Sequence, residues 1–349
     1  MKQTVAYIGL DAHARNCAMA VMNDAGEIIA ERQFQTSEEN LIEALKAVTA
    51  KVKYFAVEEN TLAAWIGQVA RPYVTDVLIA DPCENALISR NARKRDPDDA
   101  RKLCRLLRLG ELKRVYHAET DLRALFKAAA QHYLDLRDQQ VALKQKIKAM
   151  YRHWGVIDVE GKTVYSPKGR VVYLRRVCHP VVRHQLLHLY ALMDETERQE
   201  AAAARELRQL GRSFPEIKQF KKIPGIGPIN ALIFDALIQT PHRFDNKHRL
   251  WRYCRLGITD RSSDGKPLGY QRLDRSGLGD LKSLSYWAWL AALRGTNEVR
   301  KFFEASLART HDSTNARLNT QRKILAVMYG LWKHGGEYRA ECFLGSSPA

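Results

Sequence analysis

The sequence predicts a fold of the α/β plus α class, in which a small α/β domain is followed by a larger, mostly helical region. Two observations predict this. Short apolar runs separated by turn residues occupy the beginning of the chain, whereas from about residue 120 onward apolar residues recur at helical spacing. A length of 349 residues also exceeds what one hydrophobic core usually supports, so more than one domain is expected.

Three apolar runs at the N-terminus predict strands, and the turn residues Asn23-Asp24-Ala25-Gly26 predict a hairpin between the second and third. The predicted strands are 5–10, 17–22, 28–34, 54–57 and 77–80, and the predicted helices are 37–48, 62–70 and one that begins at 96. The resulting order β-β-β-α-β-α-β-α is the pattern of a ribonuclease-H-like sheet, although other α/β folds share much of it.

Two long helices, 120–154 and 181–210, are predicted on either side of a basic, irregular segment at 155–176. They predict either a coiled-coil arm or a helical hairpin packed on the body. Further helices are expected at 229–237, 281–293 and 320–332, with a basic Gly/Ser-rich segment at 257–279. The predicted domains are 1–118, 119–213 and 214–349.

The chain is strongly basic, with 56 lysines and arginines against 39 acidic residues and a formal charge of +17. This charge favours a polyanionic partner, and its spread along the chain, with a local cluster at Arg93-Lys94-Arg95, suits a long duplex footprint. A basic protein without such a partner is the alternative. The six cysteines form no CxxC pair, and neither a signal peptide nor a membrane-length apolar run is found, so we expect a cytoplasmic protein.

Acidic residues follow two predicted strands and begin one predicted helix. Asp11 ends the first apolar run, Glu58 and Glu59 end another, and Asp96 and Asp99 stand three apart at a helix start. Because side chains alternate along a strand, only one of the two glutamates can face the same side as Asp11. These carboxylates are suited to hold a pair of Mg²⁺ ions for phosphodiester cleavage.

Each of these acids also has an ordinary structural explanation. Asp96 before Pro97 is typical of a helix N-cap, and Asp99 two residues later favours the helix dipole. Asp11 is also compatible with a turn, and either glutamate with a solvated strand end.

A glycine-bearing segment, Lys221-Lys222-Ile223-Pro224-Gly225-Ile226-Gly227, precedes a predicted helix. It has the pattern of a helix-hairpin-helix, in which glycines let backbone N–H groups approach a phosphate. A glycine-bearing turn between packed helices is the alternative.

The N-terminal motifs resemble a known family. Ile8-Gly9-Leu10-Asp11, Val57-Glu58 and Asp96-x-x-Asp99-Ala100 resemble the RuvC-like DEDD domain of bacterial insertion-sequence transposases known as bridge recombinases. The family's glutamate opens a Glu-Ala-Thr/Cys-Gly stretch, which corresponds to Glu58 rather than Glu59. The resemblance implies that Asp11, Glu58, Asp96 and Asp99 are metal ligands and catalytic residues.

The second half resembles the C-terminal transposase domain of the same family. The matching motifs are Ile223 to Gly227, Arg243-Phe244, Tyr253 to Gly257, Ser262-Ser263-Asp264-Gly265-Lys266, Gly269 and Arg275-Ser276-Gly277. This implies a serine nucleophile that joins covalently to DNA, which by position is Ser263, with Ser262 as the other candidate. Arg261, Lys266 or Arg275 would stabilise the charge that develops on the phosphate.

The resemblance also implies the partners: donor and target double-stranded DNA, a structured guide RNA encoded by the element, and further copies of the chain in a dimer or tetramer. It implies a bacterial, nucleoid-associated protein. Two other functions remain compatible with the residues: a RuvC-like Holliday-junction endonuclease that needs no serine, and a non-catalytic nucleic-acid-binding protein.

Overall fold

The computed structural model describes residues 4–82, 96–118, 121–259, 262–263, 266–267 and 272–344, with the main chain alone at 96–97, 262–263, 266–267 and 344. The chain forms two compact units, Met1–His117 and Ala118–Ala349, and each is considered separately below. The division into three domains at 118 and 213 stays a prediction.

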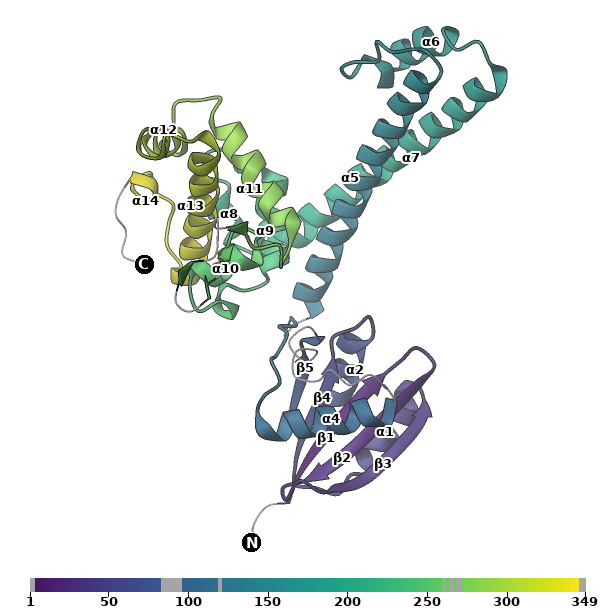
Figure 1. Ribbon diagram of the computed structural model, residues 1–349, viewed down its shortest axis with the longest axis vertical. Coiled ribbons are helices and arrows are strands. Elements are labelled where there is room, and N and C mark those ends of the chain that lie inside the picture. The colour runs from purple at the N-terminus through teal and green to yellow at the C-terminus, as the bar shows by residue number, and fades with distance from the viewer. Residues whose placement is uncertain are drawn as a thin grey trace. The chain divides into compact units, whose positions relative to one another are not determined.

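The N-terminal unit is built on a mixed five-stranded sheet with the strand order β3-β2-β1-β4-β5 (Figure 1). Its strands are β1 Val5–Ala12, β2 Asn16–Asn23, β3 Ile28–Gln35, β4 Val52–Glu58 and β5 Asp76–Ala80. Strand β2 is antiparallel to its neighbours β1 and β3, whereas β4 is parallel to both β1 and β5. This sheet is consistent with the predicted ribonuclease-H-like domain. The predicted hairpin is confirmed, and Gly26 supplies its positive φ of 89°.

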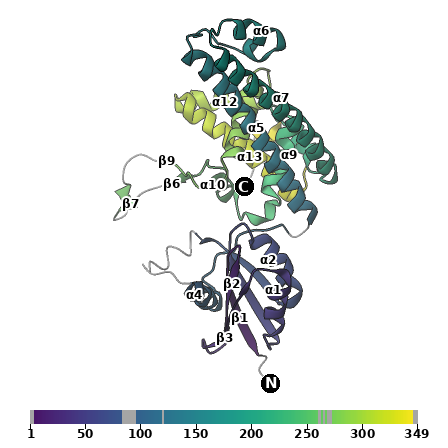
Figure 2. The ribbon, with the colours of Figure 1, turned by 90° about the vertical axis from the view of Figure 1, so that its right-hand side faces the viewer.

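Helices cover both faces of this sheet. They are α1 Glu38–Lys46, α2 Ala63–Ala70 and α4 Asp96–Leu109. Figure 2 shows α1 and α2 on one side of the sheet and α4 on the other. The alternation of side chains follows the same division: Ile8 and Leu10 of β1 are buried in the core under α1 and α2, whereas Tyr7 of β1 packs in the cluster that contains Ala100 and Cys104 of α4.

Close packing fixes α4 on β1. A Cβ added at Gly9 would collide with the carbonyl oxygen of Ala100 and lie 2.9 Å from the backbone nitrogen of Cys104. The Gly9 N–H donates to Cys104 Sγ at 3.0 Å, and this thiol donates in turn to the Ala20 carbonyl oxygen at 3.0 Å. Glycine at position 9 therefore permits the helix backbone to touch the strand.

The C-terminal unit begins with a long helical hairpin. Its helices are α5 Asp121–His153, α6 Pro167–Arg175 and α7 Pro180–Leu210. Helices α5 and α7 pack side by side, with α6 at the far end of the pair (Figure 1). The prediction of an irregular segment at 155–176 is wrong for α6, which begins where the Ser166 hydroxyl accepts from the Gly169 N–H.

The rest of the C-terminal unit is a helical body. Its helices are α8 Ile217–Phe220, α9 Pro228–Ile238, α10 Lys247–Tyr253, α11 Gly279–Ala292, α12 Glu298–Thr310, α13 Ser313–His334 and α14 Glu341–Leu344. Its short strands are β6 Ile258–Thr259, β7 Ser262–Ser263, β8 Lys266–Pro267 and β9 Arg272–Leu273, and the chain's 3₁₀ turns are η1 Arg71–Tyr73, η2 Thr163–Tyr165, η3 Gly211–Ser213 and η4 Pro241–Arg243. No helix within the described ranges is both long and apolar enough to span a bilayer.

A buried titratable group, the carboxyl of Asp235, lies in this body. Asp235 of α9 is fully buried and pairs with Arg123 of α5, which also pairs with Glu216 at 2.5 Å. The Arg123 guanidinium lies 3.8 Å from the centre of the Phe214 ring. Burial raises the pKa of Asp235 well above its usual range, against the opposing effect of the Arg123 charge. The base of α5 is therefore joined to the body by a polar contact as well as by apolar packing.

Candidate functional site

Asp11 and Glu58 lie at the carboxyl ends of two adjacent parallel strands. The register pairs Leu10 of β1 with Val57 of β4, so Asp11 and Glu58 are the next residues along the two strands. Alternation places both on the face that α4 covers, since Gly9 contacts α4 and Ala56 packs in the cluster with Leu103. Asp11 is mostly buried, with 16% of its side chain exposed.

Glu59 lies differently from Glu58. Its N–H donates to the Ala80 carbonyl oxygen at 2.9 Å, and its carboxylate Oε2 lies 2.5 Å from His117 Nε2. Its side chain is therefore engaged with His117, whereas alternation assigns Glu58 to the same face as Asp11. The sequence alone left this choice between the two glutamates open.

The first turn of α4 lies over the same strand end. Arg108, near the end of α4, donates to the Asp24 carbonyl oxygen at 3.1 Å, beside the start of β1, where Ala6 pairs with Asn23. The helix therefore runs antiparallel to β1, and its beginning lies toward the carboxyl end of that strand. Asp99 is half-buried and directly precedes Ala100, the residue packed on Gly9.

A pair of arginine hydrogen bonds also holds the beginning of α4. Arg101 binds both carboxylate oxygens of Glu31 on β3, with Nη2 to Oε2 at 2.7 Å, and Nη1 lies 3.3 Å from Asp98 Oδ1. These bonds lower the pKa of Glu31. Asp96 is the first residue of α4, and its side chain lies outside the described residues.

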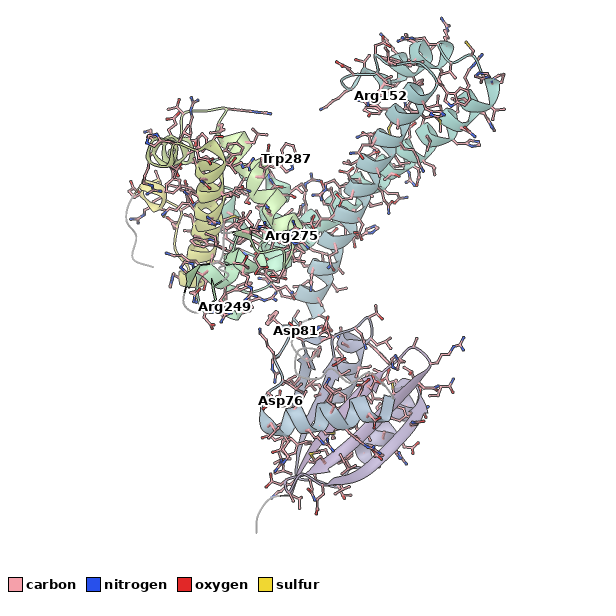
Figure 3. The ribbon with its side chains drawn as sticks, in the orientation of Figure 1. Asp76, Asp81, Arg152, Arg249, Arg275 and Trp287 are labelled. Carbon is pink, nitrogen blue, oxygen red and sulfur yellow. The ribbon has the colours of Figure 1, made fainter. Side chains whose placement is uncertain are left out.

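Three polar residues at this end of the sheet were not assigned a role from the sequence. Asn60 donates from Nδ2 to the Ala12 carbonyl oxygen at 3.0 Å, which ties the end of β1 to the residues that follow β4. Asp81 directly follows β5 and is labelled in Figure 3. The rule that identified Asp11, an acid at the end of a buried strand, would also have found Asp81. His117 pairs with Glu59, and no sequence signal identified it.

His13 lies beside Asp11. Its Nε2 lies 3.2 Å from Asp11 Oδ2, and the ring is 59% exposed.

The donor chemistry of the site fits a hard divalent cation. Asp11, Glu58 and Asp99 offer carboxylate oxygens, which Mg²⁺ prefers over the nitrogen and sulfur ligands typical of zinc. Among the side chains that the structure describes, which exclude Asp96, no three His, Cys, Asp or Glu residues lie close enough together to hold a metal ion.

The serine candidates lie on a short β-hairpin of the C-terminal unit. Ser262 and Ser263 form β7 and pair with Pro267 and Lys266 of β8. Their side chains, the side chain of Lys266 and all of Arg261 lie outside the described residues. A second strand pair, β6 with β9, carries this hairpin.

The segment after β9 is held by Asp274. Its carboxylate accepts from the Ser276 N–H at 2.8 Å and from Arg252 Nε at 2.7 Å, and the Ser276 hydrogen bonds lower its pKa. Arg275, between these residues, is exposed (Figure 3).

In the segment 221–227, packing explains the need for glycine at one of the two glycine positions. Gly225 has a φ of 87°, and a Cβ there would collide with the Ala288 carbonyl oxygen of α11. This contact supports the alternative of a glycine-bearing turn at this position. Gly227 precedes α9 and has open space at its Cβ position. Lys221 and Lys222 are exposed, whereas Arg93, Lys94 and Arg95 lie outside the described residues.

Comparison with known families identifies both halves of the chain. A family model described as "Transposase", of the DEDD type of IS110 elements, matches residues 8–153, and one described as "Transposase IS116/IS110/IS902 family" matches residues 217–304. Together they cover about two thirds of the chain. A search of curated proteins found no match. The chain is therefore a DNA transposase, an enzyme that recombines DNA.

Within that class, both matched segments are domains of IS110-family insertion-sequence transposases. Its DEDD domain implies that its activity depends on a divalent metal.

Proposed function

We propose that this transposase cuts and rejoins donor and target DNA with two sets of residues: a DEDD site made by Asp11, Glu58, Asp96 and Asp99, and a nucleophilic serine, Ser263. The main support for the acidic site is that Asp11, Glu58 and the first turn of α4 lie at the same end of the sheet. This position is the one at which α/β sheets commonly place their chemistry.

The acidic residues would hold two Mg²⁺ ions. Bound there, the ions would lower the pKa of an attacking water and stabilise the oxygen that leaves the phosphate. The chain's own contribution is to position the carboxylates: the close packing at Gly9 and the Arg101–Glu31 pair hold α4 in place. Asp81 is an additional acid at the same sheet edge.

The proposed serine lies on the β7–β8 hairpin, and basic residues flank it in the sequence. Family resemblance assigns the nucleophile to Ser263 rather than Ser262, and Arg261, Lys266 or Arg275 would stabilise charge on the phosphate during attack. The bonds that Asp274 makes to Ser276 and Arg252 support the base of this segment.

The remaining proposals concern partners. A structured RNA encoded by the element would pair with donor and target DNA, and the sites of different subunits would meet in a dimer or tetramer, with the α5–α7 hairpin as a coiled-coil arm between subunits. The protein would act on the bacterial nucleoid. The +17 charge supports a nucleic-acid partner without distinguishing RNA from DNA. Sequencing the RNA that copurifies with the protein tests whether it binds an RNA encoded by the element.

The acidic half is tested with isosteric substitutions in Mg²⁺-dependent strand cutting. Asp11→Asn and Glu58→Gln should each reduce the rate by about a hundredfold or more, because each removes a metal ligand. Glu59→Gln is the matched control, since it changes the neighbouring carboxylate that faces His117. Equal loss from Glu58→Gln and Glu59→Gln would refute the assignment.

The serine half is tested by separating cutting from joining. Ser263→Ala should abolish the covalent protein–DNA adduct, seen as a shifted band after denaturing electrophoresis, whereas Ser262→Ala should retain it. A Holliday-junction nuclease without a serine step would form no adduct in either form and would cut equally well after Ser263→Ala. A non-catalytic binding protein would cut in neither case, and Asp11→Asn would leave its DNA binding unchanged.

A further inference from the structure

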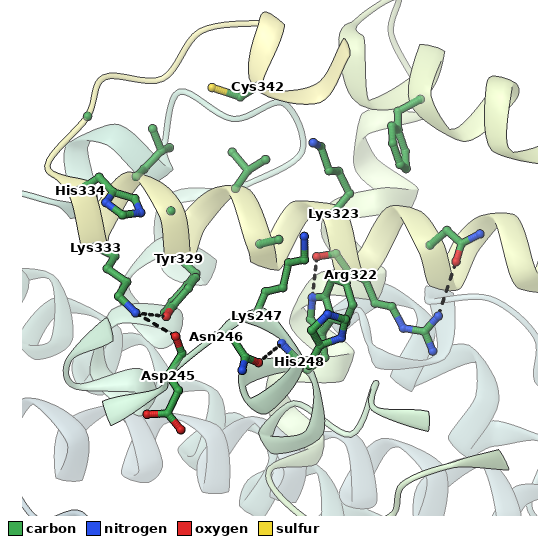
Figure 4. A pocket seen from close by; sticks show the side chains of 18 of the residues that line it. Asp245, Asn246, Lys247, His248, Arg322, Lys323, Tyr329, Lys333, His334 and Cys342 are labelled. Carbon is green, nitrogen blue, oxygen red and sulfur yellow. Dashed lines mark hydrogen bonds between the residues drawn. The ribbon is translucent and has the colours of Figure 1, made fainter. Parts of the chain in front are cut away.

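A large basic cavity in the helical body is lined by none of the residues that were assigned a role above. It has a volume of about 960 Å³ and lies between α10, α12, α13 and α14 (Figure 4). This size is at the upper end of the range typical of ligand sites, roughly 300–1,000 Å³. Apolar residues of α13, among them Ala326 and Val327, form part of its lining, together with the Phe302 ring of α12.

The cavity is lined by more cations than anions. Its basic residues are Lys247, Arg309, Arg322, Lys323 and Lys333, and its acidic residues are Asp245 and Glu337. Glu337 already lies 3.9 Å from Lys222, and Lys333 donates to the Phe244 carbonyl oxygen and to Tyr329. Within the described part of the chain, Lys247, Lys323 and Arg309 form no ion pair with a carboxylate.

Lys247 of α10 and Lys323 of α13 carry like charges into the same space. Burial lowers the pKa of Lys323, the nearby Cys342 opposes this effect, and the charge of Lys247 adds to it. A bound anion between them would offset the repulsion between the two lysines. The charge of the cavity therefore favours a negatively charged group. Its aromatic and aliphatic wall suits a ligand with a flat apolar part.

A second cavity of about 490 Å³ adjoins the first and extends toward the serine hairpin. The second is also lined by Gly257 and by Ile258, the first residue of β6. The two cavities share Asn246, His248, Trp251 and Arg322. Since β6 and β9 carry the hairpin with Ser263, the lining runs from α13 to the base of that hairpin.

We propose that the two cavities form one binding track for a single, unpaired nucleic-acid strand, with a phosphate between Lys247 and Lys323 and a base against the apolar wall. Basic residues beside aromatic rings are the usual means of holding a single strand, whereas a duplex is too wide to enter such a cavity. The track leads to the proposed serine and so rests on the proposed function in one respect: it would hold the strand that the serine attacks or releases.

The proposal is tested by strand binding rather than by catalysis. Fluorescence anisotropy measures the affinity of the full-length protein, in EDTA, for single-stranded DNA and RNA oligonucleotides of about ten nucleotides. Lys247→Glu and Lys323→Glu should each weaken binding by about tenfold and flatten its salt dependence. Lys301→Glu is the matched control, because Lys301 is an exposed lysine of α12 that lines neither cavity.

A second variant changes the shape of the cavity and leaves its charge unchanged. Gly330 of α13 lines the cavity, and a Cβ there would meet no atom within 4 Å. Gly330→Phe should therefore fold, as judged by circular dichroism, and yet weaken binding by tenfold or more by occupying the space for the base. Losing affinity for DNA alone, for RNA alone or for both would identify which strand enters.

Two results would overturn the proposal: strand affinity that is unchanged in all three cavity variants, or affinity that Lys301→Glu reduces as much as they do. Failure of the proposed catalytic roles would look different. In that case cutting by Asp11→Asn or adduct formation by Ser263→Ala would equal that of the wild type, while oligonucleotide binding in EDTA would still depend on Lys247 and Lys323.

Discussion

Gly9→Ala should damage the acidic site without changing any acidic residue. The added Cβ would lie 2.9 Å from both the Cys104 nitrogen and the Leu103 Cβ, and closer still to the Ala100 carbonyl oxygen. Because carbon atoms prefer separations of about 3.5–4.0 Å, α4 would have to move from β1 by roughly 0.5–1 Å. Overpacking of this kind costs about 1–3 kcal/mol, or a fall in Tm of roughly 4–12 °C for a unit of this size.

The displacement should cost more in activity than in stability. Asp99 lies next to Ala100, so moving α4 by up to an ångström shifts it relative to Asp11, and misplacement on this scale can lower a rate by about a hundredfold. Thermal unfolding and Mg²⁺-dependent cutting measure the two effects. Gly67→Ala in α2 is the control, because its Cβ would make only an ordinary contact of 3.4 Å with Ile79. Wild-type cutting by Gly9→Ala would refute the reasoning.

Three further predictions concern other parts of the chain. Because burial raises the pKa of Asp235, the folded protein keeps a proton there that the unfolded chain releases. Its stability should thus fall as pH rises from the ordinary carboxyl pKa toward the raised one, by about 1.4 kcal/mol per unit, and urea unfolding of Asp235→Asn should lack this slope. Burial raises the pKa of Cys104 to about 12, so iodoacetamide should label exposed Cys178 in the native protein, with Cys104 reacting only on unfolding, as mass spectrometry would show. Asn60→Ala removes the hydrogen bond to Ala12 and should lower stability by about 1 kcal/mol and slow cutting several-fold, whereas an unchanged melting curve and rate would contradict that role.

Much of the N-terminal fold follows from local patterns. Each of the five strands was predicted within two residues of both observed ends, because apolar runs bounded by turn residues carry a strong signal. The long helices α5 and α7 were predicted for the same reason. The family matches support the transposase function expected from the motifs.

The helices that the sequence did not predict are short or depend on tertiary packing. Helix α10 has only seven residues, and α12 carries charged residues between its apolar ones and begins at an Asn297 cap that was not recognised. Helix α6 lies in a segment too basic for a clear apolar face. These helices are stabilised by packing on their neighbours, which one sequence does not reveal.

For the acidic site, the sequence supplied the residue types and the structure supplied their placement. Alternation along β4 limited the choice to Glu58 or Glu59, but the pairing of Glu59 with His117 links residues far apart in sequence. In the same way, the need for glycine at position 9 arises from a helix nearly a hundred residues further along.

Helix α5 packs in the core of the helical body, and this limits how the protein can be divided into fragments. Family similarity assigns residues up to 153 to the first transposase segment, yet Phe126, Ala130 and Leu134 of α5 belong to the core of the helical body. A fragment that starts at residue 217 would expose that core and lose the Arg123 partner of Asp235. The second matched segment therefore depends on α5 of the first for its core. Relatives are expected to carry both segments together.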